Sequence, residues 1–182
     1  MTGPATAVSL PSGGFMMRAV LVFTLTVAGL LGCSAEMSAA QVPGMDRLSA
    51  YDTIDACLYR EREGEGRLSC IGEYGDACRA LSDEGDTLAG MMICAGEEYE
   101  AWDRWLNEAY RELRERLPDA SVAGIREAQR SWTAHRDQDC LFLSGLYAGG
   151  SMESLERASC LTRKTAERAI ELMYWDSNYP PF

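Results

Sequence analysis

Residues 88–117 read LAGMMICAGEEYEAWDRWLNEAYRELRERL and are followed directly by Pro118. Six large apolar residues recur in this stretch at intervals of 3, 4, 4, 3 and 4 residues: Tyr99, Trp102, Leu106, Tyr110, Leu113 and Leu117. Such intervals place the side chains on one face of an α-helix. The stretch therefore predicts a long amphipathic helix, which ends at the proline because proline cannot continue the backbone hydrogen bonds.

Two further helices are expected downstream. The first spans 121–144, and its inner face is expected to consist of Val122, Ile125, Ala128, Trp132 and the Cys140–Leu143 end. The second follows Gly149 and Gly150, with Ser151 as its N-cap, and carries an inner stripe of Leu155, Ala158, Thr162, Thr165, Ala169 and Leu172. Long helices with short connections pack as antiparallel neighbours. The sequence therefore predicts an all-α fold, a small antiparallel helical bundle of three main helices.

The chain before these helices has a different composition. Residues 41–86 are rich in glycine, cysteine and acidic residues, and short helices are expected at 45–59 and 71–81. Such a segment buries little apolar surface by itself, so it is expected to be an N-terminal extension stapled by disulfides. The helical domain is expected to span 87–182, with the aromatic tail 173–182 folding back to cap the bundle.

The N-terminal region predicts export. Arg18 precedes the uncharged apolar run Ala19–Leu31, which is typical of a signal peptide and too short to span a bilayer. Residues 1–40 are therefore expected to be a signal peptide cleaved before Gln41, with the segment before Met16 interpreted as upstream read-through. The alternative is cleavage before Cys33, which would then carry a lipid and anchor the protein to a membrane. Both routes place the protein outside the cytoplasm, either periplasmic or secreted, or as a lipoprotein of the cell envelope.

The cysteine count agrees with export. Apart from Cys33, six cysteines are present: Cys57, Cys70, Cys78, Cys94, Cys140 and Cys160. An even number in an exported chain predicts three disulfides. Cys57 and Cys70 are close in sequence and are expected to pair, whereas the other four should converge at one end of the bundle with three pairings open. A Cys-x-x-Cys motif is absent and His135 is the single histidine, so neither a metal nor a cofactor is expected.

The charge of the chain excludes some partners and favours others. The net charge is −11, which argues against nucleic acid and against an anionic membrane surface. Residues 46–103 contain fifteen acidic and five basic residues, whereas residues 104–182 contain twelve and eleven. This uneven acidity favours a cationic protein partner, although an ordinary solvated surface is the plainer interpretation.

Two groups of residues resemble catalytic sets in composition only. Glycoside cleavage needs two carboxyl groups across a deep cleft, and a small bundle offers no obvious cleft for the acids Glu97, Glu98, Glu100 and Asp103. His135 has Ser131 and Asp139 on the same helix face, but no oxyanion hole accompanies them. The sequence therefore predicts a protein that is not an enzyme.

A polar set on the expected inner helix faces comprises Asn107, Gln129, Arg136 and Asp137. We expect these residues to form a satisfied buried network that fixes helix register, with a ligand site as the alternative. Adjacent residues point about 100° apart on a helix, so Arg136 and Asp137 are not expected to pair with each other. Asn107 or Arg168 is the more natural partner.

The ordered motifs from Thr87 to Arg168 resemble the LprI-type family, named for a lysozyme inhibitor. The resemblance rests on Met92-x-Cys94, Trp102-Asp103-x-x-Leu106-Asn107-x-x-Tyr110, Ala128-Gln129-Arg130-x-Trp132, Arg136-Asp137-x-x-Cys140, Gly149-Gly150-Ser151 and Cys160-x-x-x-x-Thr165-x-x-Arg168. It implies a helical domain of the bacterial envelope that binds lysozyme as a protein partner.

The acidic segment Glu61–Gly66 is the hypothesised inhibitory loop. It contains Glu61, Glu63 and Glu65, and the expected Cys57–Cys70 bridge would hold its ends. The alternative function, from another class, is a structural or assembly module of the periplasm that has a different protein partner and leaves lysozyme unaffected.

Overall fold

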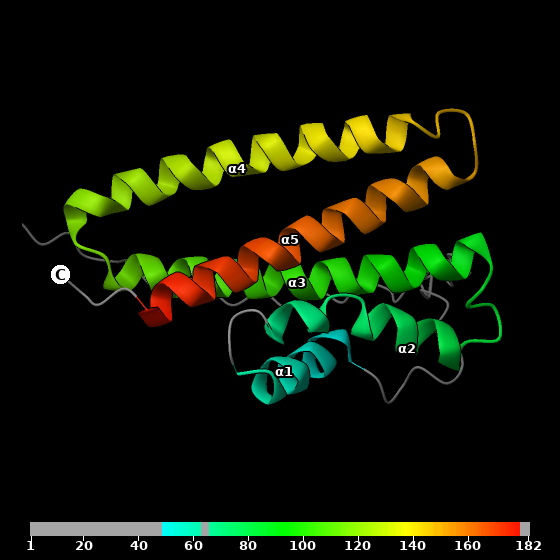
Figure 1. Cartoon of the computed structure of the whole chain (residues 1–182), viewed down its shortest axis with the longest axis horizontal. Coiled ribbons are helices and arrows are strands. Elements are labelled where there is room, and N and C mark those ends of the chain that lie inside the picture. The colour runs from blue at the N-terminus through cyan, green and yellow to red at the C-terminus, as the bar shows by residue number, and fades with distance from the viewer. Residues whose placement is uncertain (1–48, 63–65, 179–182) are drawn as a thin grey trace, which may run out of the picture. The chain divides into compact units, whose positions relative to one another are not determined.

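The computed structural model describes residues 49–62 and 66–178, and every regular element within them is helical. These elements are α1 (Ala50–Arg60), the 3-10 helix η1 (Gly66–Cys70), α2 (Glu73–Leu81), α3 (Leu88–Arg116), α4 (Asp119–Gly145) and α5 (Met152–Asn178) (Figure 1). The predicted all-α fold and its three long helices are confirmed. The expected signal peptide, Cys33 and Gln41 lie outside the described residues. Within those residues, no helix combines the length and the hydrophobicity that crossing a bilayer requires.

The long helices α3 and α5 form the centre of the structure. They run in the same direction, and α4 runs opposite to both (Figure 1). Alanines on both helices are almost completely buried, among them Ala101 and Ala109 on α3 and Ala166 and Ala169 on α5. Small side chains let two helix backbones approach closely, so α3 packs along α5. Thr162 of α5 adds a hydrogen bond from its hydroxyl to the Ala95 carbonyl of α3, at 3.3 Å.

The outer helix α4 packs on α5 and hardly touches α3, to which it is joined through Leu117 and Pro118. The expectation that consecutive helices would be packed neighbours is therefore wrong for this pair. Having one neighbour, α4 buries few side chains: Ile125, Cys140 and Ser144. Leu141 and Phe142, expected on its inner face, are 59% and 68% exposed.

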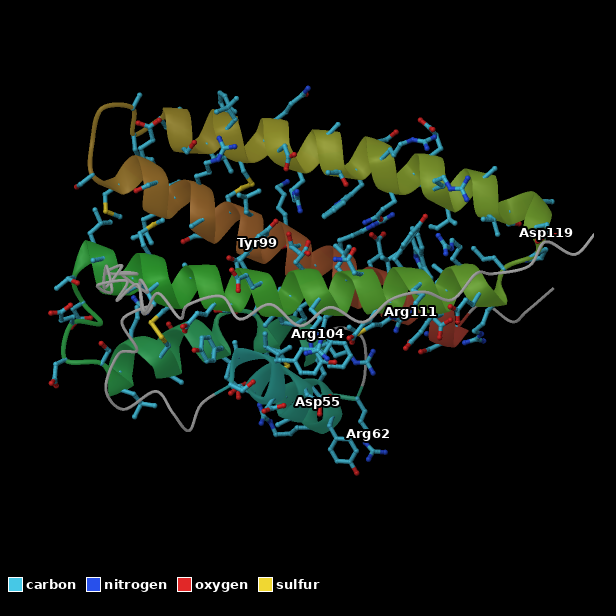
Figure 2. All side chains as sticks on the ribbon, turned by 180° about the vertical axis from the view of Figure 1, so that it is seen from behind. Asp55, Arg62, Tyr99, Arg104, Arg111 and Asp119 are labelled. Carbon is cyan, nitrogen blue, oxygen red and sulfur yellow. A yellow bond between two sulfur atoms is a disulfide. The ribbon has the colours of Figure 1, made fainter. Side chains whose placement is uncertain are left out.

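The N-terminal extension packs against α3 as part of the same core. Ile54, Cys57 and Cys70 are fully buried in one cluster with Trp102 and Leu172. Tyr51 of α1 stacks on Trp105 of α3 with ring centroids 5.0 Å apart. The guanidinium of Arg104 covers the same tyrosine ring at 3.8 Å, between α3 and α1 (Figure 2). The extension thus contributes residues to the core, in addition to being linked by disulfides.

Three disulfides join elements that are consecutive along the chain. They are Cys57–Cys70, Cys78–Cys94 and Cys140–Cys160, drawn as yellow bonds in Figure 2. The first pairing confirms the prediction, and the other two are one of the three pairings that the sequence left open. Each bridge closes a loop of 13 to 20 residues, which in the chain-entropy account contributes about 3 kcal/mol.

The aromatic C-terminal segment differs from its prediction. Helix α5 continues to Asn178, so residues 173–178 extend the helix and do not fold back. Trp175 is half-buried and packs against the main core from this helical position. Residues 179–182 lie outside the described residues.

The turn between α2 and α3 is unusually close-packed. Thr87 caps α3 by accepting a hydrogen bond at 3.0 Å from the Gly90 backbone N–H. A Cβ on Gly90 would lie 2.1 Å from the Glu84 carbonyl oxygen, and one on Gly85 would lie 2.0 Å from the Arg79 carbonyl oxygen. Only glycine fits at both positions without moving the backbone.

We predict opposite effects for two Gly→Ala changes in α3. Gly90→Ala should lower the free energy of unfolding by roughly 1–3 kcal/mol, because the new methyl group overlaps a carbonyl. Gly96→Ala meets open space and should raise that free energy by about 0.5–1 kcal/mol through helix propensity. Urea unfolding of both variants with intact disulfides measures the difference. A Gly90→Ala protein as stable as the parent would contradict this packing.

Candidate functional site

The contact between α4 and α5 brings together most of the polar residues singled out from the sequence. Arg168 on α5 is 6% exposed, and its Nε donates to Oε1 of Gln129 on α4 at 3.0 Å. Its Nη1 donates to Glu171 at 2.6 Å. One helical turn of α5 earlier, Thr165 accepts a hydrogen bond from Arg136 of α4 at 3.2 Å.

Aromatic rings alternate with these arginines. The guanidinium of Arg136 lies 5.1 Å from the centre of the Trp132 ring, and that of Arg168 lies 5.7 Å from the same ring. Arg168 also lies 4.8 Å from the centre of the Trp175 ring. Cations near aromatic faces are stabilised by the ring quadrupole, most strongly where water is excluded. The guanidinium of Arg168 is thus bonded and stacked at once, and this cluster fixes the register of α4 on α5.

Other members of the predicted polar set lie elsewhere. Asn107 is exposed, and its amide donates to Asp103 one turn earlier on the same helix, at 2.8 and 2.9 Å. Asp137 pairs with its neighbour Arg136 at 2.8 Å, so the expectation that these two would not pair is wrong. The long arginine side chain spans the angle between adjacent helix positions.

The remaining motif residues have plain structural positions. Trp102 and Leu106 are buried in the core, and Tyr110 is half-buried against it. Gly149 has a φ of 78°, a left-handed conformation that favours glycine, and its N–H donates to Glu153 at 3.1 Å. Gly150 and Ser151 are exposed in the turn that leads into α5.

Glu98 is a buried carboxylate that caps a helix, a role that the sequence did not predict. Its side chain accepts hydrogen bonds from the backbone N–H groups of Gly72 at 2.6 Å and Gly75 at 3.0 Å, and from the Trp102 indole at 3.2 Å. Gly72 precedes α2 with a φ of 92° and has no side chain to cap the helix. Glu98 of α3 therefore caps α2 from another element, where the helix N-terminus also favours negative charge.

Two features of the sequence could have indicated this contact: the glycines at 72 and 75, and a tryptophan four residues after Glu98. A Cβ on Gly75 would lie 2.7 Å from the Glu98 carboxylate, so the close approach requires glycine. The indole stands four residues after Glu98, one helical turn away. Glu98 accepts three hydrogen bonds in the interior, so it is a structural carboxylate.

The other three acids of the set, Glu97, Glu100 and Asp103, are hydrogen-bonded within the fold or exposed. Glu97 accepts a hydrogen bond from the Tyr74 hydroxyl at 2.5 Å, and burial together with this bond raises the pKa of Tyr74. Glu100 is exposed and Asp103 bonds to Asn107. The four acids therefore do not form two carboxyl groups facing each other across a cleft.

The histidine set is equally open to solvent. His135 lies 3.3 Å from Asp139 with its side chain 70% exposed, and Ser131 is exposed as well. Asp139 accepts a hydrogen bond from Lys164 at 2.6 Å, which lowers the pKa of Asp139. A charged carboxylate already committed to a lysine, at the surface, does not polarise the histidine as a buried catalytic partner would.

A half-open cavity of about 250 Å³ lies between α2, α3 and α5. Its polar lining includes Arg79, Ser159, Arg163 and Glu98. Arg79 is already paired with Asp76 at 2.6 Å. The charged groups of this lining are thus already paired or hydrogen-bonded: Arg163 lies 3.4 Å from Glu167, and Glu98 accepts the bonds described above.

Comparison with known proteins finds a match that covers most of the residues described above. A family model described as the lysozyme inhibitor LprI matches residues 78–172, slightly more than half of the chain.

The chain belongs to the LprI family.

An uncharacterized protein of Rhizobium meliloti is 34% identical over 95 residues, which cover 45% of this chain and 68% of the relative. No solved structure matches the chain. The LprI match includes the α4–α5 cluster except Trp175, and the disulfides Cys78–Cys94 and Cys140–Cys160. The Cys57–Cys70 disulfide and the hypothesised loop Glu61–Gly66 precede it.

The structure of this LprI-family chain describes that loop in part. Glu61 follows α1 and lies 3.5 Å from Arg60, whereas Glu63 and Glu65 lie outside the described residues. The bridge expected to hold the loop ends is present. Cys57 and Cys70 lie near Glu73 at a spacing that could suit a metal, but their sulfurs are joined to each other and are not free thiolates.

We predict that Glu98→Gln destabilises the protein although it hardly changes the shape of the side chain. The amide NH₂ would face one of the two backbone N–H donors, which would lose its acceptor, so the free energy of unfolding should fall by about 2–3 kcal/mol. Glu100→Gln, an exposed change two residues away, should stay within about 0.5 kcal/mol of the parent. Denaturant unfolding gives both values. Equal stability of the two variants would show that Glu98 does not cap α2.

Proposed function

We propose that this protein acts outside the cytoplasm as a lysozyme inhibitor that works by binding and not by catalysis. The single observation that carries the proposal is the LprI match, whose family description names lysozyme. The expected signal peptide and the three disulfides support an extracytoplasmic location. Glu98 and Arg168 are buried and hydrogen-bonded, and His135 is exposed, which supports a protein whose surface, rather than a reactive group, is its functional part.

Electrostatic attraction is the first element of the proposed mechanism. Residues 46–103 carry a formal charge of −10, from fifteen acidic and five basic residues. Several of these acids are exposed, among them Asp52, Asp55, Asp83, Glu84 and Asp86. Many animal lysozymes are strongly cationic, so opposite charge would accelerate the encounter and favour one orientation.

Rigidity is the second element. Disulfides join α1 to η1, α2 to α3 and α4 to α5, and the Glu98 carboxylate ties α2 to α3. A surface that is already ordered loses little conformational entropy on binding. Such a unit could cover the substrate cleft of lysozyme and block entry of the polysaccharide, without any chemical step.

We predict that the exported protein, produced in an oxidising compartment, inhibits lysis of bacterial cells by lysozyme. Inhibition should weaken from low to moderate salt, because salt screens the attraction between the two proteins. The assay is lysis measured by turbidity with increasing protein. Absence of inhibition at excess protein, against several classes of lysozyme, would refute the proposal and favour an envelope assembly module.

The acidic loop can be tested within the same assay. If Glu61–Gly66 is the blocking segment, the triple change Glu61→Gln, Glu63→Gln and Glu65→Gln should weaken inhibition about tenfold. The control removes the same charge from the exposed acids Glu112, Glu115 and Glu127, also by change to Gln, and should have a smaller effect. Full inhibition by the loop variant would exclude the loop.

A further inference from the structure

The connection between α4 and α5 exposes an unusual amount of apolar surface. Residues 140–152, which we name the apolar tip, read CLFLSGLYAGGSM and contain no charged residue. Ten large apolar side chains are exposed in the described part of the chain, and the apolar tip supplies five of them, at 44% to 68% exposure: Leu141, Phe142, Leu146, Tyr147 and Met152. Clustered exposed apolar side chains mark contact surfaces, whereas single ones are ordinary.

The apolar tip is held in shape and is not a loose loop. The Cys140–Cys160 disulfide fixes its start to α5, and Ser144 is buried with its hydroxyl donating to the Leu141 carbonyl at 3.1 Å. Successive backbone hydrogen bonds close the turn, including Tyr147 N–H to the Ser144 carbonyl at 2.9 Å and Gly150 N–H to the Tyr147 carbonyl at 2.9 Å. Its outward apolar side chains are therefore presented in a defined arrangement.

The charges around the apolar tip indicate the kind of partner. On the adjoining parts of α4 and α5, acids and bases largely offset each other. The turn between α2 and α3 lies at the same end of the structure (Figure 1) and carries the exposed acids Asp83, Glu84 and Asp86. An uncharged apolar surface at the same end of the structure as an acidic turn suits a basic protein that has an apolar depression on its surface. It suits an anionic membrane poorly.

We infer that the apolar tip is the anchor that binds the basic enzyme of the proposed function, on which this inference rests. The tip also lies inside the region that matches the LprI family, whereas the loop Glu61–Gly66 lies outside it. Apolar side chains buried at the centre of an interface mainly slow dissociation, and charges at its edge mainly speed association. The acidic turn and the apolar tip thus have separate kinetic roles.

The test is binding of the full exported protein to an immobilised, strongly basic animal lysozyme, with association and dissociation rates measured separately. Leu141→Ser with Phe142→Ser should raise the dissociation rate about tenfold or more and leave the association rate within about twofold. Asp83→Asn, Glu84→Gln and Asp86→Asn together should lower the association rate and its salt dependence. Since all five side chains are exposed, thermal unfolding should stay unchanged.

A matched control removes exposed apolar groups beside the loop Glu61–Gly66. Tyr59→Ser with Leu68→Ser changes side chains on α1 and η1 that are 70% and 47% exposed, and its dissociation rate should equal that of the parent. If Leu141→Ser with Phe142→Ser fails to fold, Leu146→Ser with Tyr147→Ser on the other side of the turn gives the same test.

The outcomes separate this inference from the proposed function. If the parent protein inhibits lysozyme and both tip variants bind like the parent, the inference is wrong and the proposed function stands. If the parent neither binds nor inhibits, both are wrong. If sedimentation shows that the parent self-associates and the tip variants are monomers that still inhibit, the tip binds a second copy of the chain and the inference is again wrong.

Discussion

The buried carboxylate of Glu98 is the contact on which the arrangement of this protein depends. A charge in the interior is tolerated only when donors satisfy it, and here the donors are two backbone N–H groups at the start of α2 and the indole of Trp102. Because α2 has no capping side chain of its own, the Glu98 carboxylate accepts from its free N–H groups, and those groups satisfy the buried charge. The Cys78–Cys94 bridge then joins the same two helices covalently. The extension and the long helices consequently form one structural unit.

The central position of α5 explains the exposed surfaces. Small residues on α3 and α5 allow those helices to pack closely, which leaves α4 with a single neighbour. The face of α4 that meets α5 carries Gln129 and Arg136, which hydrogen-bond to α5 side chains, and Trp132, whose ring lies near Arg168 of α5. Its apolar residues beyond Cys140 find no partner within the described helices. The same packing choice therefore creates both the satisfied arginine cluster and the exposed apolar tip.

Under the proposed function, this division of residues has a physical consequence. The titratable groups that resemble catalytic sets are engaged in caps and ion pairs or exposed to water, so function is proposed to lie at the surface. Acidic residues act over about a nanometre and govern the association rate, whereas apolar side chains act on contact and govern the dissociation rate. Under the proposed function, the protein would use both kinds of residue, from separate positions on a cross-linked scaffold.

The sequence by itself determined the helical class, the bounds of α3 and α4 within a few residues, the start of α5, the Cys57–Cys70 pair and the family. These features depend on local periodicity, on the positions of proline and glycine, and on ordered motifs, and all of them can be read directly from the sequence. Tertiary structure alone decided the other two disulfide pairings, the packing of α4 on α5, the role of Glu98 and the exposure of Leu141 and Phe142. Periodicity shows that a helix has an apolar face but not which helix will cover it, because that depends on how closely side chains distant in sequence can pack.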